Sequence, residues 1–89
     1  MANLYLIDKP FADTAVGLAR EDPGAEVVLL QDGVYLSVQA LLAAGKKVYA
    51  VSSDVDRRGL SGKIGRGVGL IDYPQLVDLL LANKVLNFV

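Results

Sequence analysis

The 89 residues contain no cysteine and no histidine. Without cysteine, the chain cannot form a disulfide, use a thiolate nucleophile or bind a metal through sulfur. Without histidine, it also lacks the commonest general base and metal ligand. We therefore expect no catalytic residue, no cofactor and no metal site in this chain.

An excess of charge of one sign is also missing, because nine Lys and Arg stand against ten Asp and Glu, for a net charge of -1. Such a balance creates no long-range field that would attract nucleic acid or an anionic membrane. The N-terminal residues do not resemble a signal peptide, and no apolar run approaches the roughly 18 residues of a membrane span. We expect a cytoplasmic protein with no direct nucleic-acid or membrane contact.

Apolar residues, in contrast, are abundant at 53%, against 21% charged residues. This composition is typical of a folded chain. Because single domains usually have about 100 to 150 residues, we expect one domain over residues 1–89. A domain this small buries only about 60 to 65% of its unfolded surface, so part of its apolar surface is expected to meet another subunit.

Strand-like and helix-like segments alternate along the chain. Apolar and β-branched runs predict strands at residues 2–7, 26–30, 47–51 and 68–71. Helical spacing and cap residues predict helices over 11–19, 34–44 and 52–58, and from 72–74 onward. The alternation predicts a three-layer α/β/α fold with a largely parallel sheet of four to five strands.

The last predicted helix is apolar over most of its circumference, with Leu76 and Leu80 among its apolar residues and only a narrow polar edge. A helix of this kind is expected to be covered on more than one side. We expect either that residues 84–89 fold over it as a strand or that a neighbouring subunit covers it.

Open parallel sheets usually bind ligands and partners in the loops that leave the strand C-terminal ends. After the second strand, Asp32 and Gly33 are interpreted either as a helix cap alone or as a site for an anion or a partner's carboxylate. Tyr35 is expected to pack in the core, and the alternative is that its hydroxyl faces the crevice.

A charged cluster of Asp54, Asp56, Arg57 and Arg58 follows the third strand. It is interpreted as a solvated helix face, with binding of a phosphate or carboxylate by arginine as the alternative. The glycine-rich residues 59–69 are interpreted as a flexible connection, because they match no phosphate-binding loop and precede a strand.

Asp8 and Asp72 follow the first and fourth strands, where capping and turn roles suffice for both. They would form a carboxylate pair only if their strands were neighbours. An enzyme without histidine and cysteine would have to work through a small set of other groups: Asp8, Asp32, Asp54, Ser52 and Tyr35. The spacing of these residues identifies no activating pair.

Four segments carry a family resemblance over nearly the whole chain: residues 8–11, residues 28–35, residues 48–51 followed by Asp54 and 58–60, and residues 71–73 with 77–79. In this order and spacing they resemble the TusB/DsrH family, the small subunit of the TusBCD and DsrEFH sulfur-transfer complexes. The resemblance implies a five-stranded DsrE-like fold and assembly with TusC-like and TusD-like (DsrF-like and DsrE-like) chains. It also implies a persulfide relay that ends in tRNA wobble-uridine 2-thiolation or serves sulfur oxidation.

The chain departs from the family pattern in two places. Some DsrH-type members carry a cysteine on the first helix, whereas residues 16–19 contain none, so no thiolate can accept sulfane sulfur. Members tend to end in a tryptophan-containing segment, where Phe88 would fill a similar apolar slot here. We therefore predict a noncatalytic subunit that supports sulfur transfer by cysteine-bearing partners.

The surface predicted to meet partners combines the last helix with the strand-end loops. Its residues are Asp32, Gly33, Tyr35, Asp54, Arg58, Leu76, Leu80 and Phe88. The alternative is a homo-oligomeric module of the same fold that binds a small ligand or anion in the crevice.

Overall fold

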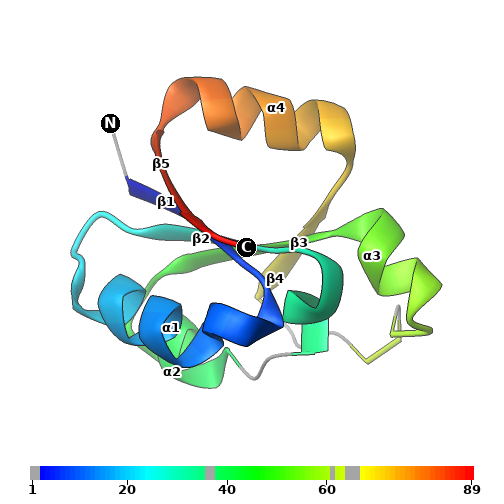
Figure 1. Ribbon diagram of the computed structural model, residues 1–89, viewed down its shortest axis with the longest axis horizontal. Coiled ribbons are helices and arrows are strands. Elements are labelled where there is room, and N and C mark those ends of the chain that lie inside the picture. The colour runs from blue at the N-terminus through cyan, green and yellow to red at the C-terminus, as the bar shows by residue number, and fades with distance from the viewer. Residues whose placement is uncertain (1–2, 36–37, 61, 64–66) are drawn as a thin grey trace.

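A parallel five-stranded sheet forms the middle layer of the computed structural model, which describes residues 3–35, 38–60, 62–63 and 67–89 (Figure 1). The strands are β1 (Asn3–Ile7), β2 (Glu26–Leu29), β3 (Lys47–Val51), β4 (Val68–Ile71) and β5 (Lys84–Phe88). Their order in the sheet is β4-β3-β2-β1-β5. The four predicted strands are confirmed to within a residue at their ends.

Helices cover both faces of the sheet (Figure 1). The helices α1 (Ala12–Glu21) and α2 (Gln39–Ala43) lie on one face, and α4 (Tyr73–Ala82) lies alone on the other. The short helix α3 (Ser52–Arg57) extends from the end of β3. This arrangement confirms the predicted α/β/α fold, in which α4 crosses the sheet and returns the chain to pair β5 with β1.

The core has two parts because alternate residues of each strand point to opposite faces. The part under α1 and α2 includes Ile7, Val27 and Leu29, with the small residues of α1 packed on them. The part under α4 consists of Leu4, Val28, Val51 and Ile71, together with partly buried neighbours. Burial on both faces explains why the strands are nearly continuous apolar runs in the sequence.

Asp72 and Asp8 each cap the helix that follows them, as the sequence predicted. The Asp72 carboxylate accepts the Gln75 backbone N–H at 2.9 Å, and the Gln75 side chain accepts the Asp72 N–H at 2.9 Å, which completes a capping box for α4. Asp8 accepts the Lys9 N–H at 2.6 Å and caps the 3₁₀ helix η1 (Lys9–Phe11). Because β2 and β3 separate β1 from β4, the Asp8–Asp72 carboxylate pair does not form.

The single helix predicted over residues 34–44 is wrong. A 3₁₀ helix, η2 (Gln31–Tyr35), follows β2, and α2 begins only at Gln39, with residues 36–37 outside the described part. The reason lies at Gly33, where a Cβ atom would stand 2.2 Å from the backbone oxygen of Ile7. The chain therefore runs tightly along the end of β1 before α2 starts. The predicted C-terminal limit at residue 44 is confirmed, since Ala44 is the C-cap of α2 and Gly45, with φ +78, ends the helix as glycine commonly does.

The last segment is a strand, but it does not cover α4. It pairs with β1 at the sheet edge, so the expectation that it folds over the helix is wrong. One side of α4 packs on the sheet through Leu76, Leu79 and Leu80. The other side exposes Tyr73, Val77 and Leu81, at 53%, 50% and 81%. We call these three residues the α4 stripe, and its cover by another subunit stays a prediction.

Two further predictions concern the connection at residues 59–69 and membrane-spanning segments. The connection at residues 59–69 lies partly outside the described residues, at 61 and 64–66. In the described part of the chain, no helix combines the length and hydropathy that a membrane crossing requires.

Asp22 joins the start of β1 to the end of α1. Its carboxylate accepts hydrogen bonds from Asn3 Nδ2 at 2.7 Å, from Tyr5 Oη at 3.0 Å and from the Gly24 N–H at 3.1 Å. Its backbone oxygen also accepts a hydrogen bond from the Lys46 ammonium. The hydrogen bond from Asn3 is the main reason why the pKa of Asp22 lies below its usual value.

We expect Asp22→Asn to weaken the fold at neutral pH but to matter less in acid. Because the folded pKa is lowered, the stabilisation is present above the unfolded pKa of about 4 and is lost as pH falls through the folded value. Urea unfolding between acidic and neutral pH, with exposed Asp56→Asn as the control, measures this difference. A gap between wild type and Asp22→Asn that is the same at every pH would contradict the assignment.

Candidate functional site

A crevice of about 410 Å³ opens at the C-terminal ends of β2 and β3, between η2, α3 and the first turns of α4. Strand-end position is the feature that predicted a site here. The residues that line it are Leu30, Gln31, Asp32, Val51, Asp54, Arg57, Arg58, Tyr73 and Leu76. The lining thus combines apolar side chains with four charged ones, Asp32, Asp54, Arg57 and Arg58.

Arg58 connects η2 to α3 across this crevice. Its Nε donates to Asp32 Oδ1 at 2.9 Å, and its Nη1 donates to the backbone oxygen of Asp54 at 3.2 Å. Nη1 also lies 3.6 Å from Asp54 Oδ1. The hydrogen bond to Asp32 is the main cause that raises the pKa of Arg58 above its already high value, so the guanidinium stays charged.

Asp54 is the buried member of the cluster, with 5% of its surface exposed. Its Oδ2 accepts the Gln31 N–H at 2.8 Å. Gln31 has φ 52, a left-handed conformation that costs a residue other than glycine about 1 kcal/mol or more. Asp54 therefore holds the strained turn that leads from β2 into η2.

The helix predicted over residues 52–58 was expected to begin with the cap residues Ser52, Ser53 and Asp54, but α3 begins after Val51 without a side-chain cap, so that expectation is wrong. The Oγ atom of Ser53 is buried without a hydrogen-bond partner within the described residues. The interpretation of the charged cluster as a solvated face holds for Asp56 and Arg57, which are exposed. It is wrong for Asp54 and Arg58. Asp54 is buried against η2, where it accepts the Gln31 N–H, and the Arg58 side chain is held by Asp32 of η2.

The residues predicted in η2 take three different positions. Asp32 is no helix cap, because it lies inside η2 and its carboxylate pairs with Arg58. Gly33 is buried against β1. Tyr35 is 53% exposed, so its predicted core packing is wrong; its ring lies beneath the Lys9 ammonium, 6.0 Å from the ring centroid. The end of η2 faces away from the core.

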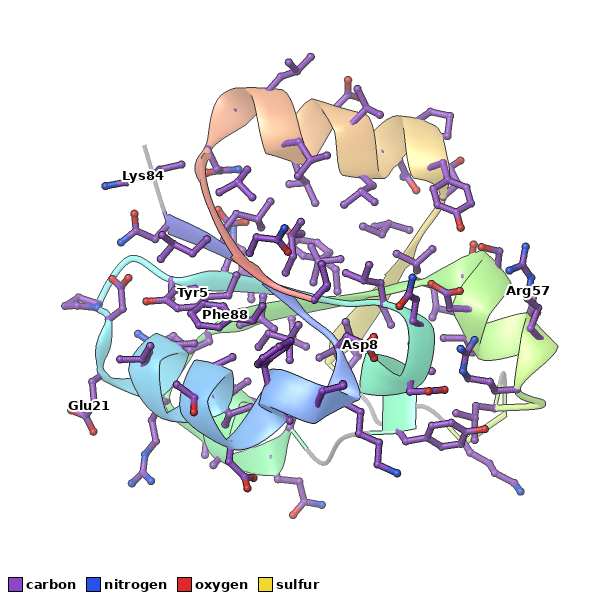
Figure 2. All side chains as sticks on the ribbon, viewed as in Figure 1. Tyr5, Asp8, Glu21, Arg57, Lys84 and Phe88 are labelled. Carbon is purple, nitrogen blue, oxygen red and sulfur yellow. The ribbon has the colours of Figure 1, made fainter. Side chains whose placement is uncertain are left out.

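The apolar residues predicted for the interface are also separated. Leu76 lines the crevice, and Leu80 packs on the sheet. Phe88 stacks on Tyr5 on the face of α1, with ring centroids 5.8 Å apart and planes inclined by 8° (Figure 2). The structure thus brings Asp32, Asp54, Arg58 and Leu76 together at one crevice and leaves the other predicted residues elsewhere.

The strand-end rule predicts crevice loops at residues 31–33 and 72–74, which contain Gln31 and Tyr73, but neither residue was singled out as a site residue. Gln31 directly follows the second apolar run. Tyr73 follows Asp72 at the end of β4 and belongs to the same class of loop. The ring of Tyr73 lines the crevice because α4 packs on the sheet.

Comparisons with known proteins agree with this fold. The ychN protein from E. coli, a crystal structure, superposes with a TM-score of 0.76 at 19% identity and covers 99% of both chains. The solution structure of Tm0979 from Thermotoga maritima gives a TM-score of 0.67 at 30% identity, over 90% of this chain and 92% of that chain. The first of these supports the fold alone.

Sequence comparisons identify the family. Protein TusB of Escherichia coli (strain K12) is 41% identical over an alignment of 73 residues, and the match covers 75% of this chain and 77% of that protein. Protein TusB of Shigella sonnei is 40% identical over an alignment of 79 residues, and the match covers 82% of this chain and 83% of that protein. The model of the family described as DsrH like protein matches residues 10–85. The chain therefore belongs to the DsrH-like family, as the sequence resemblance predicted.

Proposed function

We propose that this chain is a noncatalytic subunit of a sulfur-relay complex that docks against cysteine-bearing TusC-like and TusD-like subunits. The observation that carries the proposal is membership of the DsrH-like family by a chain whose 89 residues include no cysteine. A relay passes sulfane sulfur between thiolates. Every thiolate of the relay would then belong to the partners, which would complete tRNA 2-thiolation or sulfur oxidation.

The α4 stripe supports a docking role. Tyr73, Val77 and Leu81 are spaced by four residues, so they lie along one side of the helix. Asp78 is the only charged residue of α4. A hollow of about 390 Å³ lies along the same helix and is lined largely by apolar atoms of residues including Tyr49, Ile71 and Leu79. Apolar side chains that lie exposed along one side of a helix are typical of a protein interface.

The proposal is tested by the native mass of the protein expressed alone and co-expressed with the TusC-like and TusD-like chains of the same genome. We expect a defined hetero-oligomer in the second case, because the α4 stripe is then covered. A stable homo-oligomer that ignores those chains would contradict the proposal. It would favour instead the homo-oligomeric binding module, for which the charged crevice is the supporting observation.

A further inference from the structure

The crevice at the ends of β2 and β3 has features that partner docking through α4 does not use. Its lining contains two arginines, two aspartates and apolar side chains that include Leu30 and Leu76. We propose that this crevice binds an anionic group carried on a short apolar arm. Binding of a free anion rests on the crevice alone, whereas binding of a partner's anionic group rests also on the proposed docking function.

Arg58 supplies a pre-positioned guanidinium with free donors. Its side chain is 21% exposed and is held by Asp32 and by the backbone oxygen of Asp54. A guanidinium has five N–H donors, and the hydrogen bonds among the described residues use Nε and Nη1 but not Nη2. Because the side chain is already ordered, an anion that accepts from Nη2 avoids most of the usual cost of ordering an arginine.

Arg57 supplies a positive charge that neither carboxylate of the crevice pairs with, and together with Arg58 it balances the charges of Asp32 and Asp54. It is exposed and makes no ion pair with any residue in the described part of the chain. Figure 2 shows it projecting from α3 toward the side of the sheet that carries α4. Asp54 repels an anion only weakly, because its carboxylate is turned to the Gln31 N–H and to Arg58. Asp32 is 59% exposed, and solvent screens it.

The volume of the crevice and the apolar part of its lining define the class of ligand. A volume of about 410 Å³ lies near the lower end of the range for small-molecule sites. Two guanidiniums suit a carboxylate or phosphate, which accepts paired N–H bonds. The apolar side chains of Leu30, Leu76 and Tyr73 in the lining suit a short chain of methylene groups. Such a group is carried by a free small molecule or by an anionic side chain or C-terminus of a partner subunit.

NMR titration of the full chain with hexanoate and hexyl phosphate tests the site, with hexanol as the uncharged probe. We expect saturable shifts of the backbone amides of Gln31, Asp32 and Arg58 with both anions and none with hexanol. Arg57→Gln is expected to weaken binding about tenfold, because charge-assisted hydrogen bonds are lost. Arg20→Gln, which changes an exposed arginine on α1, is the matched control and is expected to bind as wild type.

The same titration of the assembled complex distinguishes a free small molecule from an anionic group of a partner subunit as the natural ligand. Binding that persists in the complex assigns the crevice to a free small molecule. Binding that is lost on assembly, together with weaker assembly of Arg57→Gln than of Arg20→Gln, assigns it to an anionic group of the partner. The proposal is overturned if neither anion binds saturably and both variants assemble equally well. That result leaves the proposed docking function standing, because normal assembly would still be observed.

Discussion

Gly33→Ala is expected to destabilise the fold by about 3 kcal/mol or more, one of the largest effects of any single substitution in this chain. The Cβ of alanine would stand 2.2 Å from the backbone oxygen of Ile7 and 3.3 Å from the Cα of Asp8. Both neighbours are backbone atoms, so no side-chain rotation relieves the clash. Relief requires η2 to move from β1, which would also lengthen the 3.3 Å hydrogen bond from Leu30 N–H to the Ile7 oxygen.

Gly17→Ala is the matched control for this prediction. Gly17 lies in the exposed face of α1, and an added Cβ would meet no atom within 4 Å. Alanine there should stabilise the helix by up to about 1 kcal/mol. Urea unfolding of both variants measures the two effects. Equal stability of Gly33→Ala and wild type would contradict the close packing of η2 on β1.

The double substitution Val77→Asp and Leu81→Asp is expected to abolish assembly with the partner subunits. Both side chains belong to the α4 stripe, and an interface would bury two unpaired carboxylates there. Leaving two charges unpaired is expected to lower affinity by about 100-fold or more. Native mass spectrometry of the co-expressed chains measures the loss.

Two controls separate lost docking from lost folding. Leu18→Asp places the same charge on α1, at a position 50% exposed on the opposite face of the sheet. It is expected to assemble as wild type. The single change Leu81→Asp, at a position 81% exposed, should leave the monomer folded while weakening assembly. Normal assembly of folded Leu81→Asp and of the double variant would exclude the α4 stripe as the interface.

Local patterns predicted most of the fold. Buried strands gave apolar runs at the observed positions, and the Asp72 cap marked the start of α4. Features that depend on distant contacts were not predictable. The break between η2 and α2 arises from the contact of Gly33 with β1, 26 positions earlier in the chain. Likewise, β5 pairs with β1, at the other end of the sequence, instead of covering α4.

The candidate site shows the same division. The strand-end rule predicted where the crevice lies, but the charged cluster after the third strand was interpreted as a solvated helix face. The sequence did not predict that Asp54 would be buried beneath Gln31 or that Arg58 would pair with Asp32, since these contacts join loops more than twenty residues apart. Tyr35 was placed in the core because aromatic residues are usually buried, but η2 turns its ring outward.

The most direct test of the proposed function is intact-mass mapping of persulfide sulfur on the assembled complex after it is loaded by a sulfur donor. Each added sulfur should appear on the cysteine-bearing subunits, and the mass of this chain should stay unchanged, because it has no thiolate. Removal of this chain should lower transfer by the partners without abolishing their own loading. Sulfur bound covalently to this chain, or transfer that is equally fast without it, would contradict the account.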